Sequence, residues 1–241
     1  MAKKKNSKVS KAAFKAAKVV ITKNGPYVVS GNLPLVREII AAGSDGIPVK
    51  WKKGANYPRQ ETYVLCRCGK SKNKPFCDHS HAELGFNGTE TASKKKFLEQ
   101  AGRLDGPGLF LADAKVFCAG ADFCYGAGGV WKLTLDSGNP RSRKLAIQEA
   151  CNCPSGRLVA RDKKTGKSIE PKLKQAVSIV EDPVQKVSGP IWLKGGIPLE
   201  SDSGRKYETR NRCTLCRCGY STNKPFCDGT HISARFKDEK K

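Results

Sequence analysis

The sequence is poor in the residues that build large cores and active sites. Aromatic residues make up 7% and hydrophobic residues 38% of its 241 residues. Cores built from so little apolar material are small, and metals or disulfides often hold them together. Only three histidines are present, and no Ser/His/Asp set, nucleotide-binding loop or pair of carboxylates stands out. The composition therefore gives no indication of an enzyme.

Long apolar runs are also missing. No stretch approaches the length needed to cross a bilayer, and the N-terminus lacks the apolar segment and cleavage site of a secretory signal. Eleven cysteines in a chain without such a signal indicate metal binding rather than disulfides. We therefore expect a cytoplasmic protein in a reducing compartment, with no membrane span.

Acidic residues are scarce, since 22 Asp and Glu stand against 45 Lys and Arg and give a net charge of +23. An excess of this size favours acidic partners. The basic residues are scattered along the whole chain, and aromatic residues are not interleaved with them as a base-stacking platform requires. We therefore expect an acidic protein partner rather than nucleic acid.

Most of the cysteines fall in a stretch that occurs twice. It reads CRCGKSKNKPFCDHSH over residues 66–81, the first ligand loop, and CRCGYSTNKPFCDGTH over residues 216–231, the second ligand loop. Both fit C-x-C-x8-C-x3-H, and the candidate ligands are Cys66, Cys68, Cys77 and His81, then Cys216, Cys218, Cys227 and His231. Such sets hold zinc or an iron–sulfur cluster. Most zinc pairs have two to four residues between cysteines, so the single residue here favours a cluster without excluding a Cys3His zinc site.

The spacing also predicts the local shape of each loop. Residues i and i+2 of a regular strand lie about 6–7 Å apart, too far to hold one ion. We therefore place each C-x-C in a turn, where Gly69 or Gly219 allows the bend. Asp78 and Asp228 suit the N-cap of a short helix, which puts the histidine of each motif on its first turn.

The repeat extends beyond the cysteines, since Gly25-Pro26 aligns with Gly189-Pro190. Pro26 lies 40 positions before Cys66 and Pro190 lies 26 positions before Cys216, so the first unit carries an insertion of 14 residues, which we place around 38–47. We divide the chain into a basic flexible tail (1–20), a first unit (21–94), a middle module (95–185) and a second unit (186–241). In the middle module we expect a strand at 130–136, a helix that begins at Asn139-Pro140, and a hairpin around 163–166.

The second ligand loop resembles the CDGSH iron–sulfur (NEET) family pattern, C-x-C-x2-(S/T)-x3-P-x-C-D-G-(S/A/T)-H, at every defined position. The resemblance implies one [2Fe–2S] cluster per motif. Cys66 and Cys68 would hold one iron and Cys77 and His81 the other, and Cys216 and Cys218, then Cys227 and His231, would repeat this. Two motifs in one chain resemble the tandem members of the family, which implies a monomer whose two small β-rich units form an internal pseudo-twofold pair.

The first ligand loop has His79 where the family has glycine. We interpret His79 as an exposed loop residue, and the alternative is that it competes with His81 as a ligand. If this position needs a positive φ, a histidine there is strained.

The middle cysteines resemble a second family. Cys118-x2-Ala121-x2-Cys124, followed later by Cys153-Pro154, is similar to the divergent single-cluster ferredoxins. This implies a ferredoxin-like α+β module with a third cluster, [3Fe–4S] or [4Fe–4S], on Cys118, Cys124 and Cys153, with Cys151 the weaker candidate. The alternative is a set of buried free thiols. Cys213 aligns with Tyr63 and is expected to pack rather than to ligate.

The sequence thus predicts an α+β protein that is not an enzyme. It would bind two [2Fe–2S] clusters and act in electron transfer or in cluster storage and transfer, with an acidic redox or cluster-acceptor protein as partner. The alternative function is that of a zinc-binding nucleic-acid module.

Overall fold

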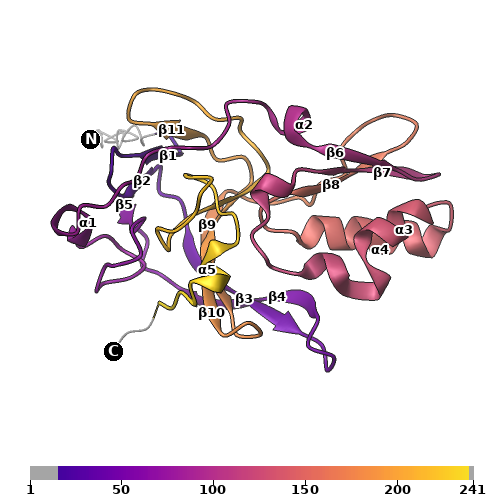
Figure 1. Cartoon of the computed structure of the whole chain (residues 1–241), viewed down its shortest axis with the longest axis horizontal. Helices are drawn as coiled ribbons and strands as arrows, with labels where there is room; N and C mark the ends of the chain where they lie inside the picture. The colour runs from indigo at the N-terminus through magenta and orange to yellow at the C-terminus, as the bar shows by residue number, and fades with distance from the viewer. Residues whose placement is uncertain (1–15, 239–241) are drawn as a thin grey trace, which may run out of the picture.

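A computed structural model describes residues 16–238, which form three β-sheets with short helices around them (Figure 1). The strands are β1 (Lys18–Ile21), β2 (Tyr27–Ser30), β3 (Leu35–Ala42), β4 (Pro48–Asn56), β5 (Thr62–Leu65), β6 (Gly102–Asp105), β7 (Leu109–Asp113), β8 (Leu158–Asp162), β9 (Ala176–Asp182), β10 (Val187–Lys194), β11 (Leu199–Ser201) and β12 (Arg212–Leu215). The helices are α1 (Ser80–Glu83), α2 (Phe97–Gln100), α3 (Val130–Leu135), α4 (Pro140–Asn152) and α5 (Thr230–Ser233), with 3-10 turns η1 (Lys115–Phe117) and η2 (Phe123–Gly128). The fold is α+β, as the sequence predicts.

The first unit contributes the hairpin β3–β4 to the sheet of the second unit, and the second unit contributes β11 to the sheet of the first. One sheet has the order β11-β1-β2-β5 and the other β12-β10-β9-β3-β4. β11 of the second unit lies parallel to β1, with Leu199 opposite Val19. β3 of the first unit lies parallel to β9, with Leu35 opposite Val177. Each unit therefore completes the sheet of the other.

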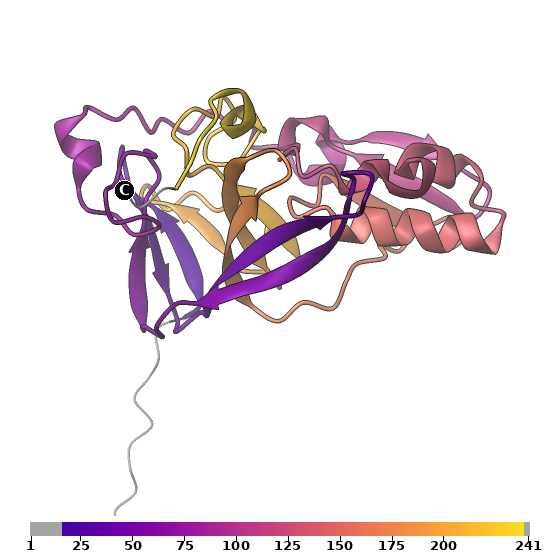
Figure 2. The same ribbon diagram turned by 90° about the horizontal axis from the view of Figure 1, so that it is seen from below.

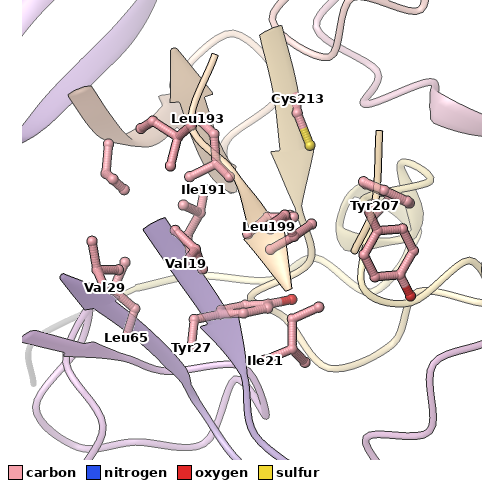
Figure 3. Packing of buried hydrophobic residues seen from close by; sticks show 14 of the residues in the cluster. Val19, Ile21, Tyr27, Val29, Leu65, Ile191, Leu193, Leu199, Tyr207 and Cys213 are labelled. Atoms are coloured by element: carbon pink, nitrogen blue, oxygen red, sulfur yellow. The ribbon is translucent and has the colours of Figure 1, made fainter. Parts of the chain in front are cut away.

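The main core lies between these two sheets (Figure 3). Val19 and Tyr27 of one sheet and Ile191 and Leu193 of the other are at most 1% exposed. Alternation places Val19 and Ile21 inward while Lys18 and Val20 are more exposed. Full burial of such a side chain is worth about 1.5–3 kcal/mol, so neither unit can separate without exposing this core.

The predicted insertion is the far part of the β3–β4 hairpin. Tyr57 N donates to Leu35 O at 3.0 Å, and Tyr207 N donates to Leu199 O at the same distance. The extra residues of the first unit thus lie between equivalent positions. They lengthen a hairpin whose outer strand, β4, exposes Lys50 and Lys52, which protects this sheet edge from pairing with another chain.

The middle of the chain forms the antiparallel sheet β6-β7-β8 with α3 and α4 packed on it. The predicted helix start is confirmed, since Asn139 Oδ1 accepts from Arg141 N at 2.9 Å at the beginning of α4. The predicted hairpin is also confirmed by a bridge between Arg161 and Ser168.

The predicted strand at 130–136 is wrong, because these residues form α3. Their alternating pattern also places Val130 and Leu133 three residues apart, which suits one face of a helix, and both are buried against α4 and β7. The sequence is compatible with both the two-residue repeat of a strand and the 3.6-residue repeat of a helix. Packing against α4 and β7 favours the helix.

Two predicted boundaries differ from the strand pairing. β1 begins at Lys18, inside the predicted flexible tail, while residues 1–15 of that tail lie outside the described residues. β9 falls within the predicted middle module but pairs with β10 and β3, so the division at 185 cuts through a sheet. In the part of the chain described here, no helix has the length and apolar character needed to cross a membrane.

Candidate metal centres

The first ligand loop leaves the sheet at the end of β5. Gly69 has φ +74 and turns the chain directly after Cys68, as predicted from the spacing. Cys66 N donates to Pro75 O at 2.8 Å and Cys77 N to Val64 O at 3.0 Å, so the returning arm lies beside the first. Cys66 Sγ and Cys68 Sγ are 3.7 Å apart as a result.

The helix α1 places the fourth candidate ligand. Asp78 accepts hydrogen bonds from Ser80 N at 3.1 Å and from Lys72 N at 2.7 Å, which ties the helix start to the preceding loop. The N-cap itself is His79, one residue later than predicted. On this short helix His81 Nδ1 lies 3.4 Å from Cys77 Sγ.

The second ligand loop repeats this geometry. Cys216 Sγ and Cys218 Sγ are 3.7 Å apart, and Cys227 Sγ lies 3.4 Å from His231 Nδ1. Asp228 accepts from Thr230 N at 3.0 Å, as Asp78 does from Ser80. Each loop thus presents its four candidate ligands as two close pairs.

Two close pairs fit a two-iron cluster better than a single zinc ion. Two sulfurs bound tetrahedrally to one metal ion lie about 3.8 Å apart, and a sulfur and an imidazole nitrogen about 3.6 Å apart. Both pairs in each loop match these separations. Within residues 16–238, however, no three Cys, His, Asp or Glu side chains converge as one ion would require. A [2Fe–2S] cluster needs only two protein ligands on each iron.

Hydrogen bonding and burial set the protonation of these groups. The hydrogen bond between the paired thiols lowers the pKa of Cys68 to about 6 and raises that of Cys66, and in the second loop it lowers the pKa of Cys216 to about 6 and raises that of Cys218. Burial and, to a lesser degree, the nearby charge of Arg217 lower the pKa of His231 to about 4. Each cysteine pair therefore loses one proton readily, and the His231 ring is neutral and able to ligate at pH 7.

The two sites differ in exposure. Cys227 and His231 are 2% and 4% exposed, whereas Cys77 and His81 are only half-buried. His79 is exposed and has φ +71 where Gly229 has φ +86, so this position does need the left-handed region. The imidazole that the structure pairs with Cys77 is that of His81, and the His79 ring lies 5.8 Å from it, between centroids.

Sequence reasoning missed the arginine between the first two cysteines of each loop. Arg67 and Arg217 are 1% and 3% exposed. Arg217 is ion-paired with Asp238 and, at 2.9 Å, with Glu181. Arg67 donates only to backbone carbonyls and forms no ion pair with a described residue. The sequence signal that could have revealed this pair is that arginine occupies the x position of C-x-C in both ligand loops.

Three of the four middle cysteines share one pocket. Cys118, Cys124 and Cys153 line it, while Cys151 lies outside and its Sγ is 3.7 Å from Ile169 O. Arg157 donates to Cys118 Sγ at 3.0 Å and is held by the carboxylate of Asp113. Burial raises the pKa of Cys124 to about 12. Cys213 packs in the main core, as expected (Figure 3).

Comparison with known proteins gives one match. A family model described as "Iron-binding zinc finger CDGSH type" matches residues 24–82 and 188–232, which contain the two ligand loops. No curated protein and no solved structure matches the chain.

Proposed function

We propose that this chain, a tandem member of the CDGSH-type iron-binding family, is a non-enzymatic iron–sulfur protein with one [2Fe–2S] cluster in each motif. The pairing of ligands within each loop carries the proposal. Cys66 and Cys68 would hold one iron and Cys77 and His81 the other, and the second loop would repeat this. The bound cluster supplies a one-electron redox couple.

The reciprocal exchange of β3 and β11 supports an internal pseudo-twofold pair. The turns of the two loops meet back to back: a Cβ on Gly69 would lie 2.3 Å from Cys218 O, and one on Gly219 would lie 2.5 Å from Cys68 O. This symmetry of contacts suits a chain that makes both halves of the pair itself.

The middle module supports a third cluster and a ferredoxin-like role. Cys118, Cys124 and Cys153 line one pocket and would be the three ligands of such a cluster, and Arg157 donates a hydrogen bond to the sulfur of Cys118. Cys151 is not part of this set. A fourth ligand would come from outside the protein, or the cluster would hold three irons.

Electron transfer is favoured over cluster delivery at the second site. Delivery requires acceptor thiols to reach the ligands, and Cys227 and His231 are buried. At the half-buried first site both roles are open. The net charge of +23 suits an acidic redox or acceptor protein as partner.

Matched cysteine variants test these assignments. Cys216→Ala should remove the visible absorption and the iron of one [2Fe–2S] cluster, because it removes one of the four thiolate and imidazole ligands of that cluster. Cys213→Ala, three residues earlier in the core, should keep both clusters. Cys118→Ala and Cys151→Ala form the same comparison for the middle site. Equal loss of iron in Cys213→Ala and Cys216→Ala would contradict the ligand assignment.

A further inference from the structure

The three candidate centres lie in a row. Figures 1 and 2 share one horizontal axis, and in both α1 of the first motif lies at one end and the middle module at the other. α5 of the second motif lies between them in both views. The second motif is therefore the neighbour of both other sites.

The middle cysteine loop packs directly on the second ligand loop. Phe117 and Phe226, which precede Cys118 and Cys227, meet edge to face with ring centroids 5.1 Å apart. Asn223 Nδ2 donates to the carbonyl of residue 116 at 2.8 Å. The segment that precedes Cys118 is thus held against the segment that precedes Cys227.

Two glycines let these loops approach closely. A Cβ on Gly229 would lie 3.3 Å from Cys118 O, and one on Gly120 would lie 2.2 Å from Ile232 Cδ1. Gly229 thus lies against the backbone of Cys118, and Gly120 lies against the side chain of Ile232.

On its other side the second ligand loop meets the first. The reciprocal contacts of Gly69 and Gly219 join the two turns, and Lys70 Nζ donates to the hydroxyl of Tyr220 at 3.0 Å. By contrast, no hydrogen bond or ring contact is found between residues 66–81 and residues 118–124.

The second site, in the middle of the row, is buried, whereas residues at the first site and at the middle-module site reach the solvent. Cys227 and His231 are 2% and 4% exposed, so these ligands lie beneath the surface. His81 at one end is half-buried, and Tyr125 beside Cys124 at the other end is 59% exposed. The ligands of the second site are therefore buried more deeply than those of the first site.

We propose that the first ligand loop, the second ligand loop and the middle cysteine site form an internal electron path. The second motif is the intermediate electron carrier between the middle module and the first motif. The inference rests on the proposed function, because it requires a cluster at each site. A low-potential one-electron donor protein reduces the middle site near Tyr125. That site is reoxidised as the electron passes to the second site and then to the first, which gives it to a one-electron acceptor near His81. The low potential of the donor and the higher potential of the acceptor set this direction.

The test follows one electron in the loaded full-length protein. Limiting photoreduced deazaflavin is added, and freeze-quench EPR follows the decay of the reduced middle-site signal. The variants are Cys227→Ser, which removes the second cluster, and Cys77→Ser, its counterpart in the first loop. We expect decay in the wild type and in Cys77→Ser, and loss of the decay in Cys227→Ser.

Decay that persists in Cys227→Ser, or that is lost in Cys77→Ser, would overturn the path. If Cys227→Ser does not fold, the wild type and Cys77→Ser still decide. Iron and sulfide are counted in each sample. A middle module without iron overturns the proposed third cluster and the path with it, whereas three loaded sites without decay overturn the path alone.

Discussion

Arg67 and Arg217 occupy equivalent positions but differ in their partners. Arg217 neutralises two carboxylates, and the side chain of Asp238 is only 4% exposed. Arg67 is equally buried, and its Nε has no hydrogen-bond partner. No described carboxylate pairs with Arg67, and its guanidinium lies over the rings of Tyr27 and Phe86 instead.

Arg217→Leu should therefore destabilise the protein more than Arg67→Leu. Removing one partner of a buried ion pair costs about 3–5 kcal/mol, because the other charge stays buried and unpaired. Removing Arg67 leaves carbonyl groups unpaired, at about 1–3 kcal/mol. Urea unfolding of the metal-free variants measures both, and equal losses would contradict this account.

Glu149 on α4 is a buried acid without a partner. It is 6% exposed, neither carboxylate oxygen has a hydrogen bond, and burial raises its pKa from 4.5 to about 7. The folded state thus holds this proton more tightly than the unfolded state does. The contribution of Glu149 to stability is therefore most favourable below pH 4.5 and is lost as the pH rises from there to about 7.

Glu149→Gln should stabilise the protein above pH 7 by up to about 3 kcal/mol and have little effect near pH 4.5, since only the charged form is penalised. Unfolding free energies at the two pH values measure this. The exposed Glu61→Gln serves as the control and should show no such pH dependence. A gain that is the same at both pH values would contradict the cause given.

At the scale of elements, the contact between the two ligand loops depends on glycine. Gly219→Ala would place a methyl group against Cys68 O and force backbone to move, in addition to the strain of φ +87. Gly204→Ala has φ +77 and open space, so it carries the strain alone. We expect about 1–2 kcal/mol for Gly204→Ala and about 1–3 kcal/mol more for Gly219→Ala.

The measurement is the unfolding free energy of both variants, together with iron content. Gly219→Ala should also lower the iron content of the first motif, because Cys68 is displaced. If Gly219→Ala and Gly204→Ala behave alike, the two loops do not press on each other.

At the scale of elements, the features that the sequence predicted correctly are those that depend on residues close together in the chain. The start of α4 follows from Asn139-Pro140, and the bend after Cys68 follows from the next glycine, because neighbours in sequence decide both. α3 was missed because the alternation of Trp131, Leu133 and Leu135 with polar residues suits a strand. Val130 and Leu133 share a helix face instead, and their packing stabilises the helix. The motif also nominates eight candidate ligands and pairs Cys77 with His81, and α1 places the Nδ1 atom of His81 3.4 Å from Cys77 Sγ.

At the scale of the whole molecule, the sequence indicated two repeats but not how they join. The parallel pairing of Leu35 with Val177 links residues far apart in the chain, and no local pattern specifies it. The burial of the second site also depends on the middle module, through Phe117 and Gly120. The repeats are alike in ligands and different in surroundings, because only one of them is covered.

Counting iron and acid-labile sulfide per chain, on protein purified without oxygen and with its visible spectrum recorded, tests the central claim most directly. The account predicts coloured protein with roughly seven or eight irons and a comparable amount of sulfide. Roughly four of each would keep the two [2Fe–2S] motifs and remove the middle cluster. Colourless protein that contains zinc and no labile sulfide would contradict the claim and favour a zinc module.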